Sequence, residues 1–149
     1  MNELRELLGR RLGVPAAAIQ LSCNQEGMPF LSRPTGTGLN FSVSHSGGLI
    51  LYALSSTGRI GVDVQVERVG VDWRGLAARF FPPEEADRVQ AEGPATFYRL
   101  WTRKEALKKA YGGSLFTWLR TDVSSPPKDC SLWTWRAEGA AASIALRRC

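Results

Sequence analysis

Three polar segments, far apart along the chain, carry the side chains best able to do chemistry. Ser44-His45-Ser46-Gly47-Gly48 places the only histidine among hydroxyl groups and flexible backbone, a set of donors suited to a phosphate. Gly61-Val62-Asp63-Val64-Gln65 holds a carboxylate between two valines, and Lys104-Glu105 lies four residues before Lys108-Lys109. Each segment also has a plain structural interpretation: a polar hairpin turn, an ion-paired strand aspartate, or helix lysines that reach water.

Magnesium is the ion that the acidic side chains suit best. Asp63, Gln65 and Glu105 together offer carboxylate and amide oxygens, the hard ligands that magnesium takes in proteins. They can form one site only if the strand that carries Asp63 packs against the helix that carries Glu105. The alternative is that Asp63 pairs with a basic residue such as Arg59, and the residues alone leave both interpretations open.

The lysines lie in a segment, 96–113, with the pattern of a helix. Its apolar side chains fall on one stripe, and Gly112-Gly113 is a natural stop. Lys104 and Lys108 fall within the apolar arc, so each must be neutralised, reach water or hold an anion. Together with the histidine turn and the strand carboxylate, this helix suits a reaction on a magnesium-bound diphosphate. No Gly-x-x-x-x-Gly-Lys-Ser/Thr segment is present, which excludes a P-loop enzyme.

The first half of the chain predicts one helix followed by strands. Residues 2–12 have helical spacing, and residues 19–23 alternate like a strand. Segments 26–30 and 33–38 are turn and loop sequences. Residues 39–45, 49–54 and 60–66 alternate and are joined by short turns, which predicts a three-stranded antiparallel meander. In its first strand Ser42 and Ser44 share the polar face.

The second half predicts mainly helices, with a hairpin at the end. Helices are expected over 71–81, 83–91 and 96–113, followed by extended segments at 114–119 and 121–123. A hairpin of 132–137 and 141–146 gives this half its own meander. The predicted fold class is therefore α+β with antiparallel strands, in one domain spanning 1–149.

Composition limits the function classes further. The 149 residues are 44% hydrophobic, carry a net charge of +5 and contain no apolar run long enough for a membrane span. The N-terminus lacks the apolar core of a signal peptide. Three cysteines without metal-ligand spacing predict reduced thiols, and hence a cytoplasmic protein. A basic surface suits nucleic acid, a phosphorylated ligand or an acidic protein partner.

Five motifs, taken in order, resemble the 4′-phosphopantetheinyl transferase superfamily, and most closely the group that activates surfactin-type peptide synthetases. These motifs are Gly27-Met28-Pro29, 40–47, 61–65, 78–82 and 97–109. The resemblance runs from roughly Arg5 to the C-terminal hairpin. It implies magnesium-dependent transfer of phosphopantetheine from coenzyme A to a serine of an acyl or peptidyl carrier protein, which releases adenosine 3′,5′-bisphosphate. It also implies two similar lobes, about 1–68 and 69–149, each a small antiparallel meander packed with helices, with coenzyme A between them.

The resemblance also implies roles for single residues. Asp63 and Glu105, joined by Gln65, would bind magnesium, and Glu105 or a bound water would take the serine proton. Lys109 would act with these carboxylates in catalysis. The implied contacts with coenzyme A are Ser44 and His45 at its phosphates, Lys104 and Lys109 at the diphosphate, and Gly27 and Pro29 near the nucleotide.

This sequence departs from the family pattern in three places. Gln65 stands where many relatives have glutamate, and Met28 stands where relatives often have lysine. The chain also begins late, so the resemblance implies that a basic N-terminal segment is absent. One alternative is thus a catalytically weak homologue that binds coenzyme A or a carrier protein. Another is that a second copy of the chain completes the site, so both a monomer and a homodimer stay open. A basic nucleic-acid-binding module is disfavoured because no zinc spacing, helix-turn-helix or RNA motif is found.

Overall fold

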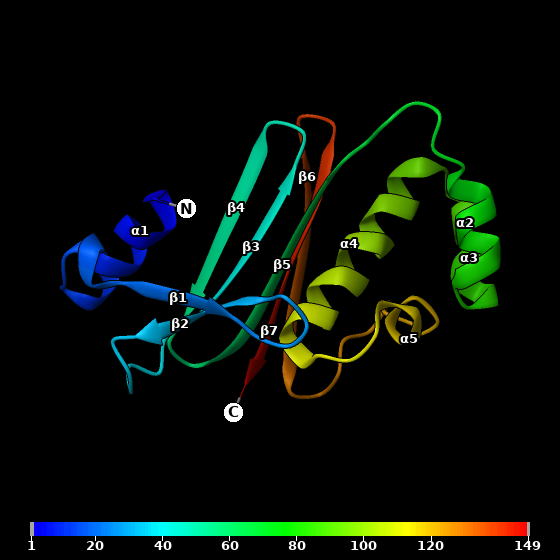
Figure 1. Cartoon of the computed structure of the whole chain (residues 1–149). Helices are drawn as coiled ribbons and strands as arrows, with labels where there is room; N and C mark the ends of the chain where they lie inside the picture. The colour runs from blue at the N-terminus through cyan, green and yellow to red at the C-terminus, as the bar shows by residue number, and fades with distance from the viewer. Residues whose placement is uncertain (1, 149) are drawn as a thin grey trace.

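The computed structural model describes residues 2–148, as helices packed against one side of a three-stranded sheet and a group of hairpins on the other (Figure 1). Two antiparallel hairpins, β1-β2 and β3-β4, come from the first half, and a β5-β7-β6 sheet follows. The elements are α1 (Asn2–Leu12), a 3-10 turn (Ala16–Ala18), β1 (Gln20–Cys23), β2 (Pro29–Arg33), β3 (Asn40–Ser46), β4 (Leu49–Ser55), β5 (Gly58–Val66), α2 (Trp73–Phe80), α3 (Pro83–Glu92), α4 (Pro94–Tyr111), α5 (Leu115–Leu119), β6 (Cys130–Ala137) and β7 (Ala140–Arg148).

The predicted fold class is confirmed: the chain is α+β, and its paired strands are antiparallel. The first helix, the three long helices of the second half and the C-terminal hairpin all form where their periodicity places them. No helix of the described residues is long and apolar enough to cross a membrane.

The predicted three-stranded meander of the first half is wrong. β5 does not pair with β4; it pairs with β7 and so joins the sheet of the second half. β3 lies beside β5 in the same direction, and serine side chains connect the two strands. The backbone N–H groups of residues 62, 64 and 66 donate to the Oγ atoms of Ser42, Ser44 and Ser46, each over 3.0 Å. The polar face of β3 is therefore the seam between the two halves of the chain.

Two shorter predictions also need correction. Residues 114–119 are not extended: Ser114 caps a short helix, α5, by accepting a hydrogen bond from the N–H of Thr117 at 3.2 Å. Residues 121–123 are not a strand either. β2 forms across the boundary of a predicted turn and loop, where pairing with β1 overrides the local preference of Pro29 and its neighbours.

Close packing of α4 on the sheet determines where its polar side chains lie. Its buried face meets alanines on β7, which form one core cluster with it. At Gly61 a Cβ atom would lie only 2.1 Å from the carbonyl oxygen of Ala106, so β5 can approach α4 this closely only with glycine there. This approach brings the next turn of α4 over the polar residues of β5. A separate cluster, which includes Leu4, Leu8 and Phe41, packs α1 against β3 and β4.

Candidate functional site

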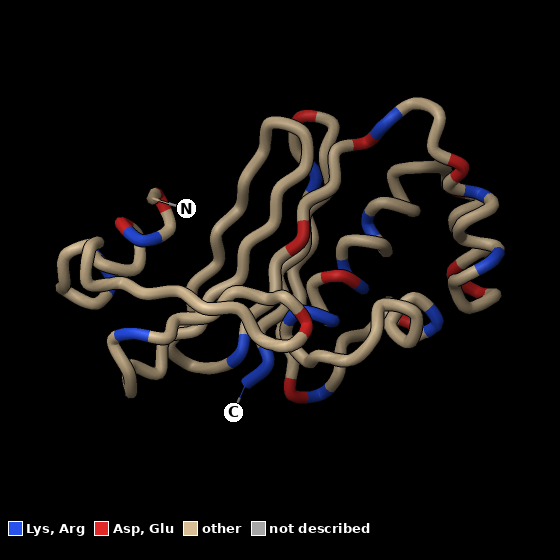
Figure 2. Tube along the Cα trace, in the orientation of Figure 1, with Lys and Arg blue, Asp and Glu red and all other residues tan. Residues whose placement is uncertain are grey.

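Asp63 and the polar side chains of α4 meet at the seam between the two halves. In Figure 2 the acidic part of β5 faces the acidic part of α4. Asp63 has a relative exposure of 4%, and its Oδ1 atom lies 3.8 Å from Lys109 Nζ. Ser44 Oγ donates to the same oxygen at 3.1 Å, while Gln65 Nε2 donates to Oδ2 at 3.3 Å. The predicted alternative partner, Arg59, is not the cation that pairs with Asp63; Lys109 is.

Lys109 is fixed by the backbone of both neighbouring strands. Its Nζ donates to the carbonyl oxygen of Val43 on β3 at 3.1 Å and to that of Val62 on β5 at 2.8 Å. Burial lowers the pKa of Lys109, while the carboxyl groups of Asp63 and Glu105 raise it in opposition. The lysine is thus a preorganised cation at the seam, held without large freedom of movement.

Two carboxyl groups share this poorly solvated space. Burial raises the pKa of Asp63 to about 7; the charge of Lys109 opposes this shift, and the nearby Glu105 adds to it. Burial also raises the pKa of Glu105. A second positive charge here would relieve both the desolvation and the mutual repulsion of these carboxylates.

The donor set fits a magnesium ion that shares its coordination with a substrate. Asp63 and Glu105 supply hard oxygen ligands on adjoining elements. Among residues 2–148 no group of three His, Cys, Asp or Glu side chains is arranged to hold a metal alone. Gln65 now turns its amide nitrogen toward Asp63, so it would have to rotate its amide to offer an oxygen.

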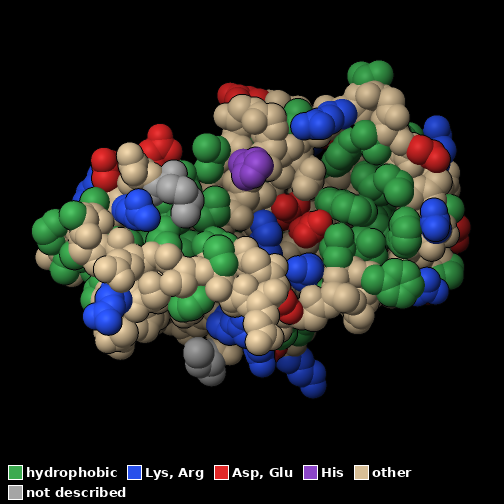
Figure 3. Space-filling model, viewed as in Figure 1, with side chains coloured by type: hydrophobic (Ala, Val, Ile, Leu, Met, Phe, Trp, Pro, Cys, Tyr) green, Lys and Arg blue, Asp and Glu red, His purple; other side chains and the backbone are tan. Residues whose placement is uncertain are grey.

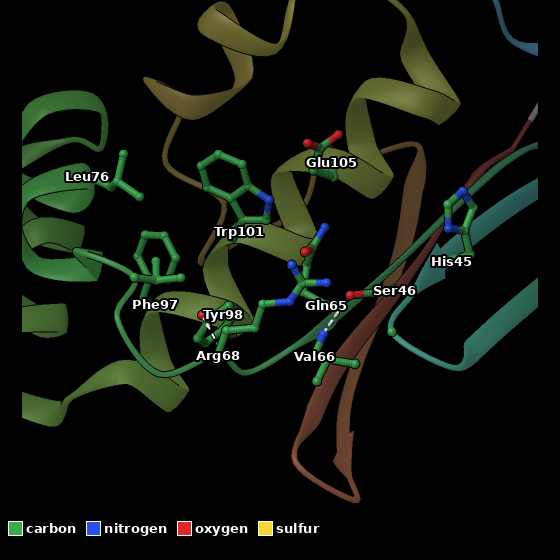
Figure 4. Close-up of a pocket in the computed structure, with 12 residues that line it drawn as sticks. His45, Ser46, Gln65, Val66, Arg68, Leu76, Phe97, Tyr98, Trp101 and Glu105 are labelled. Carbon is green, nitrogen blue, oxygen red and sulfur yellow. Dashed lines mark hydrogen bonds between the residues drawn. The ribbon is translucent and has the colours of Figure 1, made fainter.

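A cavity of about 450 Å³ opens beside these carboxyl groups. Figure 4 shows Trp101 and Glu105 reaching it from α4, with Gln65 from β5 and His45 from β3. Three predicted site residues, His45, Gln65 and Glu105, therefore line one cavity. In Figure 3 the single histidine lies above a hollow with charged groups at its centre and apolar side chains along one side.

The histidine segment divides its side chains between the cavity and the seam. His45 is exposed and lines the cavity together with Ser46. Ser44 points to the face opposite His45, where it is buried against Asp63 and the N–H of Val64. Ser46 shares the face of Ser44 and accepts the N–H of Val66, although it also lines the cavity. Ser44 thus orients the carboxylate, and His45 is the member of this segment that is exposed to the cavity.

Sequence reasoning missed the apolar wall and one cation of the cavity. Phe97 and Trp101 stack with ring centroids 5.7 Å apart, and both line the cavity. Their helical spacing marked them only as core residues. The same spacing is expected for a side chain that packs in the core and for one that lines a cavity, so the sequence cannot distinguish the two. Arg68 lines the cavity next to Tyr98, whose hydroxyl accepts a hydrogen bond from the backbone N–H of Arg68 at 3.2 Å (Figure 4).

Lys104 does not belong to this site, which corrects its expected contact with coenzyme A. Its side chain is fully buried, and Nζ donates to Glu85 Oε1 at 2.5 Å and to the carbonyl oxygen of Thr121 at 2.6 Å. It also lies over the ring of Phe81. Of the three fates expected for a lysine on the apolar arc, this one is neutralised, by a carboxylate on another helix.

Pro29 lines a narrow slot next to the carboxyl groups. The slot has a volume of about 90 Å³, and Lys109 contributes to its wall. Its other lining residues are Asn24, Met28, Phe30, Asn40, Phe41, Arg59 and Ile60. Gly27 forms the tight turn before Pro29, with φ of 78°. Because Lys109 touches both Asp63 and the slot, the slot and the carboxylate site adjoin.

Comparison with known proteins identifies the family. The family model described as the 4′-phosphopantetheinyl transferase superfamily matches residues 59–144, which hold Asp63, Glu105 and Lys109. The chain therefore belongs to this superfamily. It is 38% identical over 126 residues to the 4′-phosphopantetheinyl transferase AcpT of Salmonella typhi, a match that covers 82% of this chain and 63% of that protein.

Two further relatives carry the same family name. HetI, a 4′-phosphopantetheinyl transferase of Nostoc sp., is 34% identical over 131 residues, which cover 85% of this chain and 55% of HetI. The 4′-phosphopantetheinyl transferase of Bacillus subtilis is 32% identical over 117 residues, 75% of this chain and 50% of that protein. The chain thus spans between one half and two thirds of the length of these relatives.

Proposed function

We propose that the protein transfers 4′-phosphopantetheine from coenzyme A to a serine of an acyl or peptidyl carrier protein and releases adenosine 3′,5′-bisphosphate. The observation that carries this proposal is the meeting of Asp63, Glu105 and Lys109 beside one cavity, within the segment that matches the superfamily. AcpT, HetI and the Bacillus protein, all named 4′-phosphopantetheinyl transferases, support the same activity.

Asp63 and Glu105 would hold the magnesium ion, and Gln65 is close enough to join them after its amide rotates. Bound there, magnesium would neutralise the charge of the diphosphate. Lys109 keeps a fixed positive charge beside these carboxylates because two carbonyl oxygens hold its amine. His45 and Ser46 line the cavity from the other side, where their imidazole and hydroxyl groups would donate to phosphate oxygens.

Glu105 is the residue we propose as the base. It lines the cavity, and burial raises its pKa, which makes its carboxylate a stronger proton acceptor than an exposed one. As Glu105 takes the serine proton, the serine oxygen forms a bond to the phosphorus that carries pantetheine. The bond from that phosphorus to the bridging oxygen breaks, and its electron pair leaves with adenosine 3′,5′-bisphosphate.

The two chemically different walls of this region suit the two ends of coenzyme A. The slot of Pro29 and Lys109 adjoins the carboxyl groups, and we propose that the nucleotide lies across its mouth, since a volume of about 90 Å³ is too small to enclose a whole nucleotide. The aromatic side chains of Phe97 and Trp101 give the cavity an apolar wall for the carbon chain of pantetheine. The free thiols of Cys23 and Cys130 agree with the cytoplasmic location that we propose for this reaction.

Mass measurement of carrier proteins tests the activity directly. The protein is incubated with coenzyme A, magnesium and a panel of apo acyl and peptidyl carriers, and each carrier is weighed. We expect one carrier at least to gain one phosphopantetheine, and the gain to vanish with a chelator or without coenzyme A. If calorimetry detects binding of coenzyme A but no carrier gains mass, the protein is instead the catalytically weak homologue. Its metal site, with the two carboxylates of Asp63 and Glu105, would then explain the weak transfer.

A further inference from the structure

A strongly basic concavity lies where β5 begins and β7 ends, away from the cavity of His45 and Glu105. Its volume is about 590 Å³. The residues that line it are Arg59, Lys128, Asp129, Arg147 and Arg148. Four cations thus surround one carboxylate, and Figure 2 shows basic segments gathered beside the end of β7.

Two of its arginines are direct neighbours across the strand ladder. Arg59 on β5 is the Cα partner of Arg147 on β7. Like charges directly opposite each other in an antiparallel pair are destabilising, so this pair disfavours the fold in the absence of an anion. Asp129 relieves only Arg147, through a hydrogen bond from Nε to Oδ2 at 3.3 Å. Among residues 2–148, Arg59 and Lys128 have no carboxylate partner.

The concavity is also organised before any ligand binds. Tyr111 donates to Asp129 at 2.5 Å, and the guanidinium of Arg147 lies 4.7 Å from the centroid of the Tyr111 ring. Arg148 donates to the backbone carbonyl oxygen of Lys128 at 3.0 Å and to the hydroxyl of Ser131. Fixed guanidinium groups lose little conformational entropy when they bind, because their planar donors already face one way.

We propose that this concavity is a binding site for a compact phosphate anion that carries several negative charges. Guanidinium forks match phosphate oxygens in geometry, and three excess positive charges match a diphosphate in charge. The cations are confined to one concavity of about 590 Å³, a size that suits a small ligand better than the long backbone of a nucleic acid. The site itself does not rest on the proposed transferase activity.

Two sources of this phosphate fit the structure, because Arg59 connects the concavity with the slot. Arg59 lines both this concavity and the slot that adjoins Lys109. Either a separate di- or polyphosphate fills the concavity, or a phosphate of a nucleotide in the slot reaches it past Arg59. The shared chemistry is the same, and competition with coenzyme A separates the two sources.

Calorimetry with pyrophosphate as the probe tests the site, at low salt and without divalent ions. We expect Arg59→Gln and Arg148→Gln to weaken binding by about tenfold each, since each removes a charge-assisted contact. Arg136→Gln is the matched control: it removes the same charge from the far end of β6, where Arg136 pairs with Glu67. Weakening of equal size in Arg136→Gln would mean that only net charge matters, and would overturn the proposal.

Thermal unfolding gives a second signature that a purely structural arginine would not show. Without ligand, Arg59→Gln should raise Tm because it removes the repulsion from Arg147. With pyrophosphate, the wild type should gain more stability than the variant. A lower Tm of the free variant together with unchanged pyrophosphate binding would refute the site.

Two competition arms complete the experiment. If saturating coenzyme A displaces pyrophosphate from the wild type, the nucleotide supplies the phosphate; if both bind together, the source is a separate anion. Both results support the anion site. Tight binding of duplex DNA that is lost in Arg59→Gln and Arg148→Gln, with no heat from pyrophosphate, would assign the surface to nucleic acid and overturn the proposal.

Discussion

Asp63 owes its chemical character to the seam in which the fold places it. The residue is almost fully buried, yet its carboxylate faces a lysine, a serine hydroxyl and a second carboxyl group. An isolated buried carboxylate is costly, so such a site is maintained only where a cation offsets the cost. At the scale of single residues, the two carboxyl groups are therefore the first to test.

Loss of either carboxylate should abolish transfer without unfolding the protein. Asp63→Asn and Glu105→Gln are each expected to lower the rate by about a hundredfold or more, since both would remove a metal ligand. The rate is read from the mass of the carrier protein, and far-UV circular dichroism checks the fold. Glu67→Gln is the control because Glu67 pairs with Arg136 at 2.7 and 2.8 Å and leaves the site intact. A defect in Glu67→Gln as severe as that in Asp63→Asn would show that the ligands are assigned to the wrong residues of this strand.

Gln65 should govern how tightly the metal is held. It brings no charge and now donates to Asp63, so the site has two carboxylates. Gln65→Glu adds a third, and we expect it to lower the magnesium concentration needed for half-maximal rate. Metal titrations of both proteins, with and without coenzyme A, measure this. The same magnesium dependence in wild type and variant would place residue 65 outside the coordination sphere.

At the scale of elements, one buried ion pair fixes α4. Glu85 on α3 accepts from Lys104 on α4 and, through its other oxygen, from the N–H of Val123 at 3.0 Å. One carboxylate thus connects two helices and the segment after α5. Glu105 follows Lys104 directly in the chain, so the position of the candidate base depends on this connection.

The Lys104–Glu85 pair should behave as one unit. Glu85→Gln leaves a buried lysine without its counter-charge and is expected to cost about 3–5 kcal/mol of unfolding free energy. Lys104→Met should also destabilise, but the double variant should lose less than the sum of the two. Urea unfolding measures the cycle, with Glu6→Gln, from an exposed pair, as a control of little effect. Additive losses would show that the two side chains do not interact as described.

At the scale of the whole molecule, the buried site should make stability depend on pH. Burial raises the pKa of Asp63 from its ordinary value of 3.8 to about 7 in the folded protein. The folded state therefore binds the proton more tightly than the unfolded state does. Its contribution to stability is complete below pH 3.8 and is lost as pH rises toward 7.

The difference between wild type and Asp63→Asn isolates this effect. Without metal, the variant should gain stability relative to wild type as pH rises from about 4 to about 7, because asparagine carries no charge to desolvate. Denaturant unfolding at several pH values in a chelator measures the difference. A gap that does not change over this range would mean that Asp63 titrates near its ordinary pKa in the fold.

The sequence by itself determined most features that depend on neighbours along the chain, although it missed the short helix α5. Helical spacing places Glu105 and Lys109 on adjoining turns of α4, and strand alternation puts Ser42 and Ser44 on one face of β3. The α+β class follows from the same periodicities, and the ordered motifs identify the superfamily that the family model matches. These signals are local, since they need only the geometry of one helix or one strand.

Only the tertiary structure decided which distant groups meet. Glu85 neutralises Lys104, and Lys109 rather than Arg59 pairs with Asp63. β5 joins β7 instead of β4, while serine hydroxyls connect it to β3. Each choice is made by long-range packing: Gly61 lets α4 approach β5, and buried charges must then find partners among the groups that this packing brings near. No periodicity of the chain records those partners, because they depend on the free energy of the assembled fold.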